Sequence, residues 1–284
     1  MMRQFVGRTA FVTGGASGIG LALGRAFAEA GMKVMLADIE TDALAAAVES
    51  LQSFAPDVRG VTCDVADSAS VARAAKACYE AFGKVHVVCN NAGVGGGRGI
   101  DNISLDTWRW VLDINLMGVL HGIHTFLPHI RAHGEGGHIV NTASMAGMNS
   151  ELGFSPYSAS KFAVVNMSEG LATELAPLGI GVTVLCAGFV RTRLWESSRN
   201  RPERYGPAQT PDPTSPSGKL AAQHAELGRS GLDPSDVAAQ VLTAIREGEL
   251  YVFTHPDRRA ELEERFAAIL AAMDKAAARS PLPR

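Results

Sequence analysis

The 284-residue sequence has no long apolar run and no strong excess of charge. A helix that crosses a membrane needs about 18 or more apolar residues, and the longest candidate, residues 180–190, is interrupted by two glycines and a threonine. The formal net charge of −3 is not the excess of positive charge that is typical of proteins that bind nucleic acid. We therefore expect neither a membrane nor a nucleic acid as a partner.

Cysteine is also scarce: the chain has four, and none of them forms a C-x-x-C pair. Cys63, Cys89 and Cys186 each end an apolar, strand-like run, where a buried and reduced thiol is the expected state. Free thiols of this kind are typical of a reducing compartment. The sequence therefore predicts a cytoplasmic location.

Short apolar runs alternate with helical segments of about a dozen residues through most of the chain. This alternation predicts an α/β fold, with a parallel sheet covered by helices on both faces. Ligands of such sheets bind beyond the carboxyl ends of the strands. No repeat and no linker is visible, so we expect a single domain over residues 1–284. Strands are expected at residues 8–13, 33–37, 58–63, 85–89, 138–142, 181–186 and 250–253.

A glycine-rich turn, Gly14-x-x-x-Gly18-x-Gly20, joins the first strand to a helix. This context is typical of a dinucleotide fingerprint, because glycines let the backbone approach a pyrophosphate that is held at the helix N-terminus. Asp38 ends the second strand, where an acid binds the adenosine ribose hydroxyls. A carboxylate there would repel a 2′-phosphate, so NAD is favoured over NADP. Asp38 is also a candidate cap for the helix that follows.

Tyr157 and Lys161 lie four residues apart on a predicted helix, residues 157–178, and therefore share one helix face. A buried ammonium within about 4–6 Å of a phenol favours the phenolate and lowers the tyrosine pKa. Tyrosine then becomes a usable acid/base catalyst. The pair alone is found on many helices, so its meaning depends on the dinucleotide motif that accompanies it.

The regular alternation stops near residue 193, and six prolines lie between residues 193 and 234. Irregular segments of this length are usually lids or binding loops. We expect a substrate lid at about residues 193–232, with a helical piece at 218–227, and a C-terminal amphipathic helix at about 257–278. Helices at 105–133 and 157–178 are apolar on several sides, which predicts a subunit interface and a homodimer or homotetramer.

Five motifs follow one another along the chain: Thr13-Gly14-x-x-x-Gly18-x-Gly20, Asn91-Ala92-Gly93, Asn115, Ser144 and Tyr157-x-x-x-Lys161. Together they resemble those of single-domain short-chain dehydrogenases/reductases, in family order and over about residues 5–255. The resemblance implies a Rossmann-type doubly wound parallel sheet of about seven strands flanked by helices. It also implies hydride transfer between nicotinamide and an alcohol or carbonyl carbon.

The resemblance further implies roles for individual residues. Tyr157 would be the general acid/base, and Lys161 would lower its pKa and bind the nicotinamide ribose. Ser144 would hold the substrate oxygen, and Asn115 would support a water relay behind Lys161. The family has Pro-Gly after the sixth strand, whereas this chain has Ala187-Gly188, which lacks the fixed φ of proline. The implied cofactor-binding residues are Gly14, Ser17, Gly18, Ile19, Gly20, Asp38, Asp64, Val65, Asn91, Gly93, Tyr157, Lys161, Val190 and Thr192.

The candidate substrate contacts are apolar or aromatic, which indicates a bulky hydrophobic or aryl-bearing secondary alcohol or ketone. Packing of the lid alone would explain several of them equally well. An anionic group on the substrate stays an open alternative, because three arginines could bind it: Arg98, Arg191 and Arg193. The long loop and the 251–256 segment are also similar to family members that oxidise aromatic secondary alcohols, including the Cα position of lignin-derived aryl ethers. The candidates are Met145, Leu152, Phe154, Phe189 and Trp195, with Met148 and Tyr205 as further wall or lid residues.

Two alternatives to a dehydrogenase stay open. Epimerases and dehydratases of the same superfamily share the Tyr/Lys pair, but they usually carry G-x-x-G-x-x-G and a longer substrate domain, which this chain lacks. A non-catalytic NAD-binding sensor or scaffold typically loses the Tyr or the Lys, and both are present here. The pairs His121/His124 and His129/His133 have ligand-like spacing without the acid of H-E-x-x-H, so no metal site is predicted.

Overall fold

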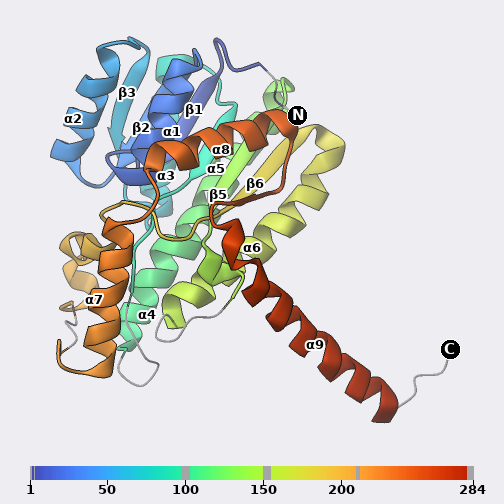
Figure 1. Cartoon of the computed structure of the whole chain (residues 1–284). Coiled ribbons are helices and arrows are strands. Elements are labelled where there is room, and N and C mark those ends of the chain that lie inside the picture. The colour runs from blue at the N-terminus through green and yellow to red at the C-terminus, as the bar shows by residue number, and fades with distance from the viewer. Residues whose placement is uncertain (1, 3, 97–102, 150–154, 209–211, 280–284) are drawn as a thin grey trace.

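Seven parallel strands form one sheet in the order β3-β2-β1-β4-β5-β6-β7 (Figure 1). The computed structural model describes residues 2, 4–96, 103–149, 155–208 and 212–279. The strand order reverses between β1 and β4, and ligands of such sheets bind in the crevice at this switch point. The predicted doubly wound α/β fold is confirmed. The strands are β1 (Thr9–Thr13), β2 (Lys33–Asp38), β3 (Val58–Thr62), β4 (Val87–Asn90), β5 (Gly137–Thr142), β6 (Ile180–Cys186) and β7 (Tyr251–Phe253).

Helices cover both faces of the sheet, and alternate residues of each strand point to opposite layers. In β1, Val12 packs in the layer of α1, α2 and α8, whereas Phe11 packs in the layer of α3, α5 and α6. Figure 1 shows α1 and α8 side by side across the first of these faces. The helices are α1 (Gly18–Glu29), α2 (Thr41–Gln52), α3 (Ser68–Phe82), α4 (Leu105–Leu112), α5 (Gly118–His133), α6 (Ser155–Leu175), α7 (Pro216–Arg229), α8 (Pro234–Glu247) and α9 (Arg259–Arg279).

The single helix predicted at residues 105–133 is interrupted in the structure. A π-helical segment, Asp113–Met117, separates α4 from α5 and carries Asn115. A π turn shifts the residues that follow it around the helix axis, and such turns are frequent at functional sites. Hydrophobic periodicity follows the apolar face on both sides of this segment and does not reveal the local change in hydrogen bonding.

The lid, residues 193–232, is largely helical where the structure describes it. Short 3-10 helices at Leu194–Asn200 and Glu203–Tyr205 precede α7, which extends two residues beyond each end of the predicted helical piece. The C-terminal α9 projects from the body of the molecule in Figure 1 and leaves Phe266, Leu270 and Met273 exposed. Among the described helices, none combines the length and apolar character that a membrane span requires. The single-domain interpretation stays a prediction.

Replacing Phe126 with alanine should lower the free energy of unfolding by about 3–5 kcal/mol. Phe126 is fully buried in α5 and its ring centroid lies 4.5 Å from that of Phe11, so the change leaves a cavity between helix and sheet. Denaturant unfolding measures the loss. Phe266→Ala is the control, because this ring is 48% exposed and its removal should cost no more than about 0.5 kcal/mol. Equal losses of unfolding free energy in the two variants would contradict the placement of Phe126 in the core.

Candidate active site

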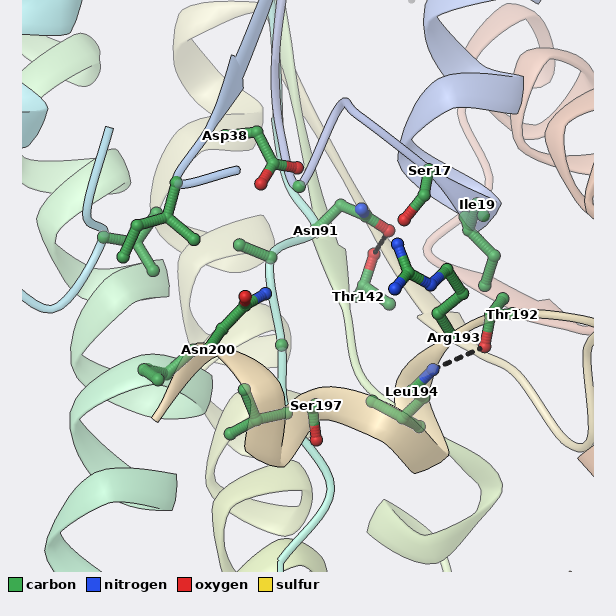
Figure 2. A pocket seen from close by; sticks show the side chains of 18 of the residues that line it. Ser17, Ile19, Asp38, Asn91, Thr142, Thr192, Arg193, Leu194, Ser197 and Asn200 are labelled. Atoms are coloured by element: carbon green, nitrogen blue, oxygen red, sulfur yellow. Dashed lines mark hydrogen bonds between the residues drawn. The ribbon is translucent and has the colours of Figure 1, made fainter. Parts of the chain in front are cut away.

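A cleft opens beyond the carboxyl ends of the strands, and its empty volume, open solvent included, is about 1340 Å³. Gly20, Asn115, Ser144 and Met145 are not among the residues that line it. Figure 2 shows Asp38, Ser17 and Ile19 facing the lid residues Leu194, Ser197 and Asn200 across this space. The predicted site residues that line the cleft are Gly14, Ser17, Gly18, Ile19, Asp38, Asp64, Val65, Asn91, Gly93, Tyr157, Lys161, Phe189, Val190, Thr192 and Trp195.

The glycine turn has the shape that a pyrophosphate needs. Gly14 adopts a φ of +65°, and a Cβ on Gly20 would lie 2.0 Å from the carbonyl oxygen of Gly14. Ser17 is the N-cap of α1, but its side chain makes no capping hydrogen bond. The first amide groups of α1 are therefore left for an anion. This cradle fits the pyrophosphate of a dinucleotide.

Asp38 lies at the end of β2, at the edge of the cleft (Figure 2). Its Oδ2 accepts from the Ala16 amide at 2.9 Å, and its Oδ1 accepts from the Glu40 amide at 3.0 Å. These two bonds orient the carboxylate and leave acceptor capacity on both oxygens. The expectation that Asp38 caps α2 is wrong, because Glu40 is the N-cap of that helix and makes no side-chain capping bond.

Asn91 ties the ends of three neighbouring strands together. Its amide nitrogen donates to the Thr13 hydroxyl at 2.9 Å, and its Nδ2 donates to the Thr13 carbonyl at 3.0 Å. The Thr142 hydroxyl donates to Asn91 Oδ1 at 3.2 Å (Figure 2). Asn91 therefore borders the cleft with a side chain that β1 and β5 hold in place.

Lys161 is the most deeply buried charge of the site. It is 3% exposed, its Nζ donates to the Thr142 carbonyl at 2.8 Å, and Nζ lies 5.6 Å from the centroid of the Tyr157 ring. Burial lowers the pKa of Lys161 to about 8, so the ammonium is still the main form at pH 7. A positive charge this close favours the phenolate of Tyr157, which is half-buried and lines the cleft.

Ser144 follows β5, and its side chain is 8% exposed. Its Oγ donates to the Ala187 carbonyl at 3.2 Å and accepts from the Ala146 amide at 3.1 Å. The second bond caps a short 3-10 helix, Met145–Gly147. A Cβ on Gly147 would lie 2.6 Å from the Lys161 carbonyl oxygen, so this helix is pressed against α6 near the lysine.

Asn115 is fully buried, and its carboxamide makes three hydrogen bonds. Its Oδ1 accepts from the Val94 amide at 2.8 Å, and its Nδ2 donates to the Val94 carbonyl at 2.9 Å and to Ser160 Oγ at 3.3 Å. Ser160 Oγ in turn donates to the Tyr157 carbonyl at 2.6 Å. Asn115 thus connects the segment after β4 to the helical turn that carries Tyr157. The water relay that the resemblance implies stays a prediction.

An aromatic wall stands at the lid end of the cleft. The rings of Phe189 and Trp195 stack with centroids 6.2 Å apart, and the ring of His224 lies 5.6 Å and 6.1 Å from them. His224 was not among the predicted site residues, because α7 was expected to be only a helical piece of the lid. A Cβ on Gly228 would lie 1.8 Å from Trp195 Nε1, so α7 packs directly against this indole.

The other candidate substrate residues have different surroundings. Met145 is 3% exposed and packs in the core. Met148 packs against that core, and the Tyr205 hydroxyl donates to Asp113 at 2.8 Å. Leu152 and Phe154 lie outside the described residues. Among the candidates that the structure describes, only Phe189 and Trp195 line the cleft.

The arginines considered for an anionic substrate are paired with carboxylates. Arg191 forms an ion pair with Asp233, and Arg193 lies 3.1 Å from Glu196 and 3.6 Å from Glu40. Arg98 lies outside the described residues. These pairings weaken the case for an anion on the substrate.

The histidine pairs considered for a metal make other contacts. His121 Nδ1 lies 2.9 Å from the Val65 carbonyl oxygen, His133 Nε2 lies 3.0 Å from the Val85 carbonyl oxygen, and the His129 ring packs on Tyr79. Within the described part of the chain, no three histidine, cysteine, aspartate or glutamate side chains are grouped as metal ligands.

Comparison with known proteins identifies the family. The family model for short chain dehydrogenases matches residues 8–203. The chain belongs to this family. The short-chain dehydrogenase is 34% identical to a C alpha-dehydrogenase from Sphingobium sp., over 95% of this chain and 87% of that protein. It is 33% identical to a 1-deoxy-11-beta-hydroxypentalenate dehydrogenase from Streptomyces avermitilis, over 91% of this chain and 88% of that protein.

A solved structure is similar over the whole length. A short chain dehydrogenase/reductase from Burkholderia phymatum, determined in complex with NAD, superposes with a TM-score of 0.91 at 39% identity, and the match covers 100% of this chain and 99% of that one. The family expectation is therefore confirmed. This short-chain dehydrogenase is an oxidoreductase with a small-molecule substrate and a nicotinamide cofactor.

Replacing Lys161 with methionine should stabilise the fold at pH 7 by about 1 kcal/mol. The drop in pKa from 10.5 to about 8 corresponds to about 3 kcal/mol, and the lost charge-assisted hydrogen bond to the Thr142 carbonyl offsets about 2 kcal/mol of it. Below pH 8 the folded wild type carries the buried charge in full. This cost disappears as the pH rises from about 8 to 10.5, so the difference between the two proteins should shrink over that range.

Denaturant unfolding between pH 7 and pH 10.5 measures this difference. Lys76→Met is the control, because the Lys76 side chain is 77% exposed and its replacement should change the stability by no more than about 0.5 kcal/mol at any pH. A Lys161→Met variant that is less stable than wild type at pH 7 would contradict the assigned burial cost.

Proposed function

We propose that this short-chain dehydrogenase interconverts a bulky, hydrophobic or aryl-bearing secondary alcohol and its ketone, using NAD(H) and Tyr157 as general acid/base. The observation that carries the proposal is the placement of Tyr157 within one cleft. The buried Lys161 ammonium lies on one side of the phenol, and the aromatic wall of Phe189 and Trp195 belongs to the same cleft.

The cofactor preference rests on Asp38. Its carboxylate borders the cleft next to the glycine turn, where it would bind the adenosine ribose hydroxyls and repel a 2′-phosphate. Gly14, Gly18 and the first turn of α1 would hold the pyrophosphate, and Lys161 would bind the nicotinamide ribose. When bound, the nicotinamide accepts or supplies the hydride. The short-chain dehydrogenase from Burkholderia phymatum, solved with NAD, supports this choice.

The proton is handled by Tyr157 and its neighbours. The Tyr157 phenolate takes the proton of an alcohol, and in the reverse direction the Tyr157 phenol gives its proton to a carbonyl oxygen. The Lys161 ammonium stabilises the phenolate form. Ser144 Oγ would bind the substrate oxygen after exchanging its bond to the Ala187 carbonyl. Asn115 acts as a positioning residue, because its carboxamide holds Val94 and Ser160, and through Ser160 the Tyr157 turn.

Two further properties are part of the proposal. All four cysteines are free and buried, which supports a reducing, cytoplasmic location. Leu105, Met117 and Leu120 are exposed along α4, the π segment and α5, which supports a homodimer or homotetramer formed through these helices.

Replacing Tyr157 with phenylalanine should lower kcat by about 10²–10⁴-fold, because the ring is kept and only the acid/base hydroxyl is lost. NADH binding should weaken by no more than about fivefold, since at most one hydrogen bond to the cofactor, worth about 1 kcal/mol, is removed. Steady-state oxidation of a secondary alcohol and NADH fluorescence titration measure the two quantities. Tyr205→Phe makes the same chemical change outside the cleft and should retain activity. Full activity in the Tyr157 variant would exclude the assigned chemistry, whereas a wild type that binds NADH and oxidises no alcohol would leave a cofactor-binding sensor or scaffold.

Replacing Trp195 with alanine should raise the KM for a good aryl secondary alcohol by about tenfold or more, because a buried aromatic contact is lost. The KM for isopropanol, a molecule too small to reach the wall, should change little. A panel of aryl, steroid and aliphatic secondary alcohols with NAD supplies the substrates. Turnover of small polar sugars alone would refute the proposed substrate class.

A further inference from the structure

The lid brings three guanidinium groups to the cleft beside the ends of β2 and β3. Arg193, Arg199 and Arg204 all line the cleft. Each faces a carboxylate that follows one of these strands: Glu40 lies opposite Arg193 and Arg199, and Asp64 lies 3.0 Å from Arg204. The contacts of Arg199 and Arg204 join positions 159 and 140 apart in the chain, so they exist only because the lid folds over this end of the cleft.

Glu40 is the centre of this arrangement. Its two oxygens accept from Arg199 Nε at 3.2 Å and from Arg199 Nη2 at 2.5 Å, which is a bidentate pair. Asn200 Nδ2 adds a third bond at 2.9 Å, and Arg193 Nη1 lies 3.6 Å away. The hydrogen bond from Arg199 lowers the pKa of Glu40, so the carboxylate is ionised at neutral pH.

The same residue lies next to the proposed ribose-binding acid. The Glu40 amide donates to Asp38 Oδ1 at 3.0 Å, and both residues line the cleft. A 2′-phosphate on the adenosine ribose would therefore approach Asp38 within reach of the lid. Arginine binds phosphate with two parallel hydrogen bonds, so Arg199 and Arg193 would attract such a group if no carboxylate occupied them.

We propose that Glu40 is a second specificity-determining residue for the cofactor, because it holds Arg199 in a bidentate pair and withholds this guanidinium from a 2′-phosphate. This inference rests on the proposed use of NAD(H). The Asp38 carboxylate would repel a 2′-phosphate. Glu40 occupies the guanidinium whose attraction for that phosphate would offset the repulsion. Without Glu40, Arg199 would lose its bidentate carboxylate partner, whereas Arg193 would keep Glu196. The released guanidinium would let the cleft accept NADP(H).

Glu40→Gln tests the inference by binding alone, without any substrate. The variant keeps the length of the side chain and removes its charge. Fluorescence titration gives the Kd of NADH and of NADPH, and we expect the ratio of the two to shift toward NADPH by about tenfold or more, because charge-assisted contacts to phosphate become available. NADPH binding by this variant should weaken steeply with added salt, since the new contacts are between partly exposed charges.

Three companion variants identify the cause. Glu196→Gln is the matched control, because Glu196 also pairs with Arg193 but does not line the cleft, and it should leave the ratio unchanged. Glu40→Asp keeps the charge and should stay close to wild type. The double variant Glu40→Gln/Arg199→Gln should lose most of the NADPH gain, as expected when the two residues act through one interaction.

The outcomes separate this inference from the proposed function. If wild type prefers NADH and Glu40→Gln keeps the wild-type ratio, the specificity role is refuted and the proposed function stands. If the double variant retains the full NADPH gain, Arg199 is not the phosphate-binding group and the inference fails. If wild type binds neither dinucleotide, the proposed function itself is wrong. Should Glu40→Gln not fold, Arg199→Gln still tests the inference, because it should leave NADH binding within about threefold and not improve NADPH binding.

Discussion

The site depends on one interaction, the hydrogen bond from the buried Lys161 ammonium to the Thr142 carbonyl at 2.8 Å. This bond fixes a charge inside the protein, where burial lowers its pKa to about 8 and makes its field strong. Lys161 belongs to α6 and Thr142 to β5, so the hydrogen bond between them fixes the helix that carries Tyr157 against the sheet. Gly147 and Asn115 also help to position this helix. Gly147 lets a short 3-10 helix pack closely against Lys161. Asn115 holds the helical turn of Tyr157 through Ser160.

The sheet explains why residues so distant in sequence meet. Parallel strands end on the same edge, so the glycine turn after β1, Asp38 at the end of β2 and Asn91 after β4 all border one cleft. Asn91 then joins the ends of β1 and β4 by hydrogen bonds to the hydroxyl and the carbonyl of Thr13. A rigid frame of this kind lets a flexible dinucleotide be held at many points at once.

Much of this could be predicted from the sequence. The alternating strands, the glycine turn and the Tyr157/Lys161 pair depend on periodicity and on short spacings, which a sequence displays directly. The π-helical interruption at Asn115 was not predicted, because no apolar pattern reports a change of backbone hydrogen bonding or the two bonds that the Asn115 carboxamide makes to Val94. Met145 was expected at the substrate and lies in the core, since side-chain direction after a strand depends on the cap that Ser144 forms. The pairing of Arg199 with Glu40 joins positions 159 apart, a relation visible only once the lid is folded.

The lid crosses the cleft from one side of the sheet to the other. It leaves the sheet after β6, near the aromatic wall, and its arginines reach the carboxylates that follow β2 and β3. The ion pairs of Arg199 with Glu40 and of Arg204 with Asp64 therefore bridge the cleft beside the ends of β2 and β3. A dinucleotide bound beneath them, as we propose, would enter only while these pairs are open, and the alcohol would follow at the end that carries the aromatic wall. This geometry favours a compulsory order of addition, in which the coenzyme is the first reactant to arrive and the last product to depart.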